Sequence, residues 1–314
     1  MRIIRGLEQV RPEDRGASTA LGNFDGVHLG HQAVIDLARA PDAPLGVITF
    51  EPHPREFFAP DAPPFRLMNA AARAHRLEKL GVERLFELRF DAALAALSAE
   101  EFARKVLAEA LGVKRVVVGA DFRFGKGRAG DAETLRRLGD ELGFEVRAAG
   151  LVRGPAGEEI SSTAIRRALL EGRPEDARRM LGHWHRIDGE VRHGDKRGRE
   201  LGFPTANLSL ERLLVPRHGV YAVLVEVLDG PFRGVRQGAA SIGVRPTFGI
   251  NAPNLEVHLL DFSGDLYGAQ ISVALVSFIR PEEKFDDVEA LIARMREDCA
   301  EARRRLAAAS VAAS

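Results

Sequence analysis

Two histidines three residues apart, His28 and His31, end a glycine-rich segment that begins at Gly22. Residues at this spacing lie on one side of a helical turn. Glycines let the backbone approach a ligand closely, and a helix N-terminus favours anions. Paired imidazoles there can donate hydrogen bonds to the charge that develops when a phosphoryl-type group is transferred. The spacing alone also fits a structural turn or a metal site, although the metal hypothesis lacks a third ligand nearby.

A second chemically dense segment runs from Gly189 to Leu208. It mixes glycines with five cationic or potentially cationic side chains, which could wrap a polyphosphate. Thr205 and Asn207 are two residues apart, so in an extended segment both side chains point to one face. Neutral oxygens of this kind suit Mg²⁺ that is also bound to ATP phosphates. The alternative is a basic surface hairpin that contacts RNA, and the spacing is not that of a Walker A loop.

Two further groups of residues could take part in chemistry. Residues 160–166 place Ser and Thr hydroxyls at a helix start, followed by Arg166, whose fork of donors can reach phosphate oxygens. Glu256 lies on a predicted strand and shares a face with His258. An ordinary helix cap and a surface carboxylate are the corresponding structural alternatives.

Composition limits the class of protein. The chain has 314 residues, 45% hydrophobic and 29% charged, which favours two folded domains. Basic and acidic residues number 45 each, so no global basic field attracts nucleic acid or an anionic membrane. The one cysteine, Cys299, excludes an intramolecular disulfide and a cysteine-rich zinc site. No apolar stretch approaches the roughly 18 residues of a membrane span, and we expect a cytoplasmic protein without nucleic-acid or membrane partners.

The elements that must position these residues change character along the chain. Up to residue 183, predicted strands alternate with helices of about ten residues, which argues for a parallel α/β sheet. The strands are expected at 18–21, 45–50, 85–88, 115–118 and 145–151, and the helices at 31–39, 70–80, 98–111 and 132–142. Two short helices follow, one ending at Gly172 and one running from Pro174 to Gly182.

After residue 183 the predicted strands follow one another without helices. They are expected at 220–227, 238–242, 255–262 and 270–279, and a final helix at 285–308. Such a run indicates a small antiparallel sheet or barrel. The expected fold is therefore α/β plus β, with domains at 1–183 and 184–314.

The segment 22–31 resembles the GxFDGxHxGH signature of the bacterial bifunctional riboflavin kinase/FMN adenylyltransferases. Residues 49–54, 118–125 and 161–166 resemble that family's TFxPHP, VGxDFRFG and SSTxIR motifs. The resemblance implies a Rossmann-like nucleotidyltransferase domain with His28 and His31 as catalytic residues. It further implies that ATP phosphates contact Gly22, Phe24, Asp25, Gly26, Gly30, Ser162, Thr163 and Arg166, and that FMN contacts His53, Asp121 and Phe124. Some relatives carry Asn in place of Asp121, which bears on the role of that residue. Some carry a basic residue in place of Glu159, so in this chain Lys126 or Arg128 could supply part of the triphosphate contact.

The second half resembles the riboflavin kinase part of the same family. The segment 194–208 is similar to its GxxRGRxLGFPTANL signature, and residues 219–222, 241–248 and 280–285 are similar to its GVYA, SIGxxPTF and RPExKF segments. The resemblance implies a small barrel with a terminal helix in which Glu256 is the general base on the riboflavin 5′-hydroxyl. It assigns Mg²⁺ to Thr205 and Asn207, the flavin to Arg296, and ATP to Gly194, Arg197, Gly198, Gly202 and Pro204.

The resemblance covers residues from about 15 to 306 and implies two reactions. The second domain would phosphorylate riboflavin with ATP and Mg²⁺ to give FMN, and the first would adenylylate FMN to FAD and release pyrophosphate. Riboflavin, FMN and ATP are then the partners, and transient self-association is left open. Two alternatives remain: a transferase that uses another phosphate ester, and a non-catalytic flavin- or RNA-binding protein on the same folds.

Overall fold

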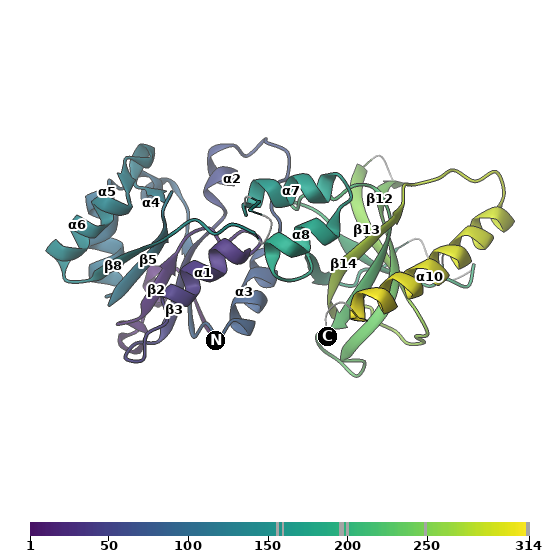
Figure 1. Cartoon of the computed structure of the whole chain (residues 1–314), viewed down its shortest axis with the longest axis horizontal. Helices are drawn as coiled ribbons and strands as arrows, with labels where there is room; N and C mark the ends of the chain where they lie inside the picture. The colour runs from purple at the N-terminus through teal and green to yellow at the C-terminus, as the bar shows by residue number, and fades with distance from the viewer. Residues whose placement is uncertain (155–156, 159, 195–197, 199–200, 248–249, 312–314) are drawn as a thin grey trace. The chain divides into compact units, whose positions relative to one another are not determined.

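The computed structural model describes residues 1–154, 157–158, 160–194, 198, 201–247 and 250–311 (Figure 1). The chain forms two compact units, one from Met1–Pro63 and Arg73–Ile160 and the other from Pro64–Ala72 and Ser161–Ser314. Residues 161–183, which the sequence assigns to the first domain, therefore group with the second unit. The reason is that the helix at Pro174–Leu181 contacts a strand of the second sheet, at Gln270–Arg280.

The first unit is built on a six-stranded sheet in which every neighbouring pair is parallel, as predicted. The strands lie in the order β1 (Arg2–Arg5), β4 (Arg84–Arg89), β3 (Leu45–Glu51), β2 (Ser18–Leu21), β5 (Arg115–Gly119) and β8 (Glu145–Ala149). Its helices are α1 (Leu29–Leu37), α2 (Pro54–Phe58), α3 (Ala70–Lys79), α4 (Ala92–Ala96), α5 (Ala99–Glu101), the π-helical η3 (Phe102–Ala110) and α6 (Ala132–Leu142). The edge strand β1 was not predicted, since only one of its four residues is buried.

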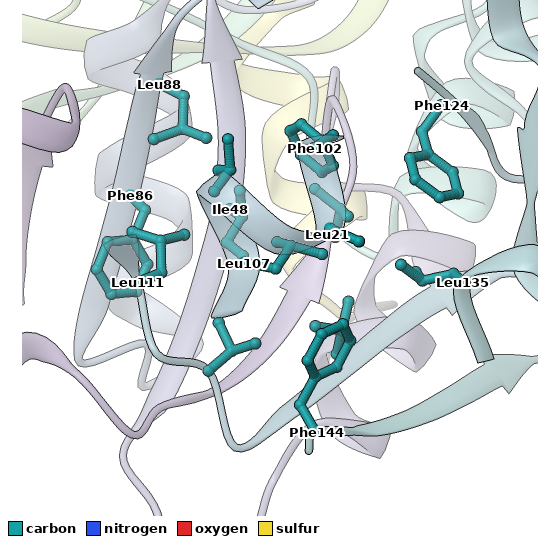
Figure 2. Close-up of a cluster of buried hydrophobic side chains, with 14 of the residues drawn as sticks. Leu21, Ile48, Phe86, Leu88, Phe102, Leu107, Leu111, Phe124, Leu135 and Phe144 are labelled. Atoms are coloured by element: carbon teal, nitrogen blue, oxygen red, sulfur yellow. The ribbon is translucent and has the colours of Figure 1, made fainter. Parts of the chain in front are cut away.

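One face of this sheet carries the larger apolar cluster (Figure 2). Alternate strand residues such as Leu21, Ile48 and Phe86 meet Phe102 and Leu107 of η3. Their strand neighbours, which point to the opposite face because side chains alternate along a strand, are buried as well. Burial on both faces is the reason these strands are short, continuous apolar runs.

Shorter elements surround the sheet. They are η1 (Leu7–Gln9), η2 (Pro12–Asp14), η4 (Lys126–Arg128) and the two-residue strands β6 (Arg123–Phe124) and β7 (Gly130–Asp131). The predicted cap of the 98–111 helix is confirmed: Ser98 accepts from the Glu101 N–H (3.1 Å), and the Glu101 carboxylate accepts from the Ser98 N–H (3.1 Å).

The second unit contains an antiparallel six-stranded sheet that nearly closes into a barrel. The strands lie in the order β10 (Ala206–Ser209), β13 (Ile250–Leu259), β12 (Gly234–Thr247), β11 (Gly219–Val227), β14 (Gln270–Arg280) and β9 (Arg186–Glu190). Just past β9, the Arg192 N–H donates to the Asn207 carbonyl at 2.9 Å, which links the two edge strands. The barrel with a terminal helix is thus as predicted, although β9 and β10 were missed.

The helices of the second unit whose bounds lie within the described residues are α7 (Ser162–Leu170), α8 (Pro174–Leu181) and α10 (Val288–Val311). The buried side of α10, formed by Cys299, Ala302 and Leu306, packs on the outside of the barrel against Ala222 and Ala239. The helix begins three residues later than predicted. The Asp287 carboxylate accepts a hydrogen bond from the Ala290 N–H (2.6 Å) and acts as the start signal.

Candidate active sites

In the first unit, three of the motif segments leave the same edge of the sheet. Residues 22–28 follow β2, residues 52–53 follow β3, and residues 120–122 follow β5. These three strands are parallel neighbours in the order β3, β2, β5. From β2 the chain proceeds to β3 and β4 on one side, and then crosses to β5 and β8 on the other. Ligands of open α/β sheets bind outside the carboxyl ends of the strands at such a reversal.

The turn after β2 has an unusual backbone. Phe24 and Val27 have positive φ angles of 52° and 45°, and Gly26 has one of 90°. A branched residue such as Val27 rarely adopts this region, so neighbouring contacts must impose it. The Phe24 side chain is 1% exposed and Asp25 is 4% exposed, so both predicted ligand residues lie inside the turn. Phe24 and Asp25 therefore shape the turn from within, and their contacts with ATP phosphates stay predictions.

His28 and His31 lie together at the start of α1. The His28 side chain caps the helix: its Nδ1 accepts from the His31 N–H at 3.2 Å. The two rings are stacked, with centroids 3.6 Å apart and an interplanar angle of 17°. A Cβ at Gly30 would lie 3.1 Å from the His28 ring, which explains the glycine between them. Since Nδ1 is an acceptor, the His28 proton resides on Nε2, which can donate to a phosphate oxygen.

His53 has a similar arrangement at the start of α2. Its Nδ1 accepts from the Arg55 N–H (3.0 Å), and its own N–H donates to the Glu56 carboxylate (3.0 Å). The side chain is 9% exposed. The donor for the predicted FMN contact of His53 would therefore be its Nε2–H. The same atom of His28 would be the donor for its predicted phosphate contact.

The predicted flavin residues after β5 have different surroundings. Phe124 is 8% exposed and belongs to the hydrophobic core, where its ring centroid lies 5.9 Å from that of Phe102 (Figure 2). Asp121 is exposed. Most of the Phe124 ring is thus committed to packing, and its contact with FMN stays a prediction.

An exposed aromatic cluster that the sequence analysis missed lies beside His53. Phe58 is 69% exposed and Phe57 is 36% exposed. Their centroids lie 5.8 Å and 5.5 Å from that of Phe90, which follows β4. The signal was the pair of adjacent phenylalanines separated by two residues from the end of the TFxPHP-like segment. Such a cluster offers an apolar surface on which a planar ring could stack.

The remaining residues predicted for the adenylyl-transfer site begin α7 in the second unit. Ser161 caps the helix by accepting from the Ala164 N–H (3.2 Å). Ser162 and Thr163 form the first turn, whose N–H groups have no intrahelical acceptor in any α-helix. The Arg166 Nε donates to the Phe65 carbonyl (2.8 Å), and its guanidinium lies over the Phe65 ring at 5.2 Å. That α7 and the histidine turn serve one triphosphate remains a prediction.

In the second unit, strand register brings the predicted kinase residues together. Asn207 on β10 lies directly opposite Glu256 on β13, so both side chains project from the same face. Asn207 is 6% exposed, and its Oδ1 accepts from the Asn254 Nδ2 at 3.0 Å. Its Nδ2 donates to the Thr205 carbonyl at 3.3 Å. The side chain of Asn207, one of the two predicted magnesium ligands, is therefore held in place opposite the predicted general base.

The glycines of the signature segment approach this group closely. A Cβ at Gly194 would lie 2.6 Å from the Asn207 Nδ2. A Cβ at Gly198 would lie 2.4 Å from the Phe203 carbonyl oxygen. The Phe203 N–H donates to the Gly198 carbonyl at 2.7 Å. Gly202 has a φ of 86°, which permits the turn. Arg197, also predicted for this site, lies outside the described residues.

The residues next to Pro204 link the segment to β13. The His258 Nδ1–H donates to the Pro204 carbonyl at 2.9 Å, and the Phe203 ring meets the His258 ring edge-on at 5.3 Å. Glu256 and His258 share a face of the strand, as predicted. The loop that would hold nucleotide is thus attached to the strand that carries the base.

Arg296 lies exposed on α10, and the described part of the chain records no hydrogen bond or ion pair for it. Its neighbour Asp298 instead makes a buried bidentate pair with Arg280, at 2.8 and 2.7 Å. This pair fixes α10 to the end of β14. The predicted flavin contact of Arg296 stays a prediction.

The described residues contain neither a cluster of the usual metal-binding side chains nor a membrane-spanning helix. No three His, Cys, Asp or Glu side chains gather there as they would around a metal ion. No described helix is long and apolar enough to cross a membrane. The ligands predicted for Mg²⁺ are of another kind, the hydroxyl and amide oxygens of Thr205 and Asn207, and this donor set fits a hard cation.

Comparisons with known proteins agree with both halves. The FAD synthetase family model matches residues 10–164, and the riboflavin kinase family model matches residues 181–306. A bifunctional riboflavin kinase/FMN adenylyltransferase of Pseudomonas fluorescens is 45% identical over 96% of this chain and 97% of its own. The corresponding protein of Escherichia coli K12 is 43% identical over 94% of this chain and 95% of its own.

One solved structure is similar over nearly the whole chain. It is described as a macrolide-efflux protein from Streptococcus pneumoniae, with a TM-score of 0.79, 34% identity, and coverage of 95% of this chain and 96% of that one. The two family models and the full-length relatives agree on the family, as the motifs in both units do. The chain belongs to the bifunctional riboflavin kinase/FMN adenylyltransferase family and carries both of its catalytic domains.

Proposed function

We propose that this chain makes FAD from riboflavin in two steps, each at its own site. The group formed by Asn207, Glu256 and Thr205 would phosphorylate riboflavin, and the turn that carries His28 and His31 would adenylylate FMN. The observation that carries this proposal is that the histidine turn follows β2 at the edge of the parallel sheet, while Asn207 and Glu256 lie opposite each other on the paired strands β10 and β13. The family assignment supports the order of the two reactions.

In the kinase step, Glu256 would accept the proton of the riboflavin 5′-hydroxyl as its oxygen attacks the γ-phosphorus of ATP. A bond forms between that oxygen and phosphorus, and the bond to ADP breaks. This step needs a base because the hydroxyl is not ionised at neutral pH. Thr205 and Asn207 would hold Mg²⁺, which neutralises phosphate charge when bound. The hydrogen bonds of Asn207 to Asn254 and to the Thr205 carbonyl orient its amide beforehand.

In the adenylyl-transfer step, an oxygen of the FMN phosphate would attack the α-phosphorus of ATP in line, and the bond to pyrophosphate breaks. The FMN phosphate is already ionised at neutral pH, so this step needs no general base. His28 would donate from Nε2 to the charge that builds up on the α-phosphate, with its tautomer fixed by the cap to His31. The transfer would be direct, without a covalent enzyme intermediate. The exposed Phe57 and Phe58, which pack on Phe90, would stack with the flavin ring.

The direct test is to incubate the purified protein with riboflavin, ATP and Mg²⁺ and to separate the flavins by chromatography over time. We expect FMN to appear first and FAD to follow, and we expect chelation of Mg²⁺ to stop FMN formation. A second incubation that starts from FMN should give FAD and pyrophosphate. If folded protein formed neither FMN nor FAD, the proposal would be refuted. Adenylylation of another phosphate ester but not of FMN would reassign the first site.

A further inference from the structure

A buried arginine lies behind the histidine turn. Arg73 on α3 is 1% exposed and is among the largest fully buried side chains of the protein. Its Nη2 contacts the Glu51 carboxylate at 2.9 Å and the Glu87 carboxylate at 3.1 Å. A charge this deep in a protein persists only where partners compensate its loss of water. The two carboxylates supply that compensation.

Arg73 also reaches the turn itself. Its Nη1 lies 3.5 Å from the Asn23 carbonyl oxygen, which also accepts from the Thr49 hydroxyl at 3.2 Å. Glu51 ends β3 and Glu87 lies in β4, whereas Asn23 follows β2. One guanidinium therefore connects three neighbouring strands at the edge where the turn begins.

The turn needs such restraint because its backbone is strained. Phe24 and Val27 hold positive φ angles, and such conformations persist only where the surroundings impose them. On the far side of the turn the Gln32 side chain donates to the Val27 carbonyl at 2.8 Å. Arg73 and Thr49 hold the near side. The turn that presents His28 is thus fixed at both ends.

From this arrangement we propose that Arg73 is a positioning residue for adenylyl transfer. It does not touch the substrates; it holds the Asn23 carbonyl, and through it the turn that sets the His28 imidazole. This inference rests on the proposed function of the first unit. A misplacement of about 1 Å in a catalytic group can cost about 100-fold in rate, so loss of Arg73 should lower kcat far more than it changes KM.

The competing explanation is that Arg73 only neutralises Glu51 and Glu87. Three variants separate the two: Arg73→Met, the triple variant Arg73→Met/Glu51→Gln/Glu87→Gln, and Arg73→Lys. For each we would measure the melting temperature, kcat and KM for conversion of FMN to FAD, and riboflavin phosphorylation as an internal control. The wild type, which must convert FMN to FAD, tests the proposed function separately.

We expect Arg73→Met to lower both the melting temperature and kcat, with kcat at least 30-fold below wild type and KM changed by less than about 3-fold. The triple variant should regain the melting temperature but not kcat, and Arg73→Lys should regain part of kcat. Recovery of kcat in the triple variant, or unchanged kcat in Arg73→Met, would overturn the positioning role. If these variants do not fold, Thr49→Val provides a second test, because it removes the other donor to the Asn23 carbonyl. It should lower kcat by about 3- to 10-fold. Unchanged kcat in Thr49→Val would equally overturn the proposal that the hold on this carbonyl positions His28.

Discussion

The two units support their chemistry in different ways. In the first, the motif residues lie in loops that follow strands β2, β3 and β5, and helix caps set their side chains, as His28 and His53 show. In the second, Asn207 and Glu256 lie within paired strands, and their relation follows from the register of β10 against β13. The loop site depends on anchors that come from distant parts of the chain. The strand site depends on pairing, and a slip of one residue would turn its side chains to the other face.

The largest effect is expected at the strand site. Glu256→Gln keeps the size of the side chain but removes the base, so FMN formation should fall by about 10²- to 10⁴-fold. Conversion of FMN to FAD should stay within 2-fold of wild type, because Glu256 belongs to the kinase site and not to the proposed adenylyl-transfer site. Glu226→Gln, on β11, is the matched control and should leave both rates unchanged. Equal loss of both activities in folded Glu256→Gln protein would contradict the separation of the sites.

At the loop site, His28 has two roles that substitution can divide. His28→Ser retains an oxygen that can cap α1 but lacks the Nε2 donor, so FAD formation should fall by about 10²- to 10³-fold while the melting temperature stays close to wild type. His28→Ala should lose the cap as well, at about 1 kcal/mol of stability. Riboflavin phosphorylation reports on the intact second unit in both variants. Full activity of His28→Ser would show that the ring serves only as a cap.

The close approach of Gly194 to Asn207 gives a smaller, graded prediction. A Cβ at Gly194 would lie within 3 Å of all three outer atoms of the Asn207 amide, so Gly194→Ala should displace that amide. We expect about a 10-fold loss of kinase rate and a higher Mg²⁺ concentration for half-maximal rate, as in Asn207→Ala. Gly150→Ala, where nothing lies within 4 Å, should leave both quantities unchanged. An unaltered Mg²⁺ dependence in Gly194→Ala would argue against Asn207 as a ligand.

A pH effect on stability is expected from a buried histidine of the second unit. Burial lowers the pKa of His185 from 6.5 to about 3. Below about pH 6.5 the unfolded chain therefore binds a proton that the folded unit does not, so the free energy of unfolding falls by up to ~1.4 kcal/mol per pH unit as the pH drops. Denaturant unfolding can be followed through the fluorescence of Trp184 at pH 6.5, 5.5 and 4.5. As the pH falls, the free energy of unfolding should decrease less in His185→Gln than in the wild type. Parallel curves for the two proteins would contradict this.

Much of the fold could be predicted because local signals agree with the final structure. The alternation of apolar strands and capped helices gave the α/β unit, and α6 has the predicted bounds, since Asp131 caps it and Gly143 ends it in a left-handed conformation. The strands β1, β9 and β10 were missed because they are short and contain polar residues or glycine. Tertiary pairing, not local propensity, decides such strands.

The sites, like the fold, could be predicted only where local sequence signals were enough. Signature segments predicted which residues matter, but not which of them are buried: Phe124 lies in the core, whereas the unnoticed Phe58 is exposed. Arg73 on a charged helix looks like a solvated side chain in the sequence. Its partners Glu51 and Glu87 lie 22 and 14 residues away and meet it only in the folded sheet.

The central claim is that two separate sites act in sequence through FMN. The most direct test mixes Glu256→Gln protein with His28→Ser protein and supplies riboflavin, ATP and Mg²⁺. Each variant alone should make little FAD, because one lacks the kinase step and the other the adenylyl-transfer step. The mixture should make FAD, since FMN released by the His28→Ser protein is adenylylated by the other. A mixture that forms FMN but no FAD, although the Glu256→Gln protein is folded and supplied with ATP, would contradict two independent sites.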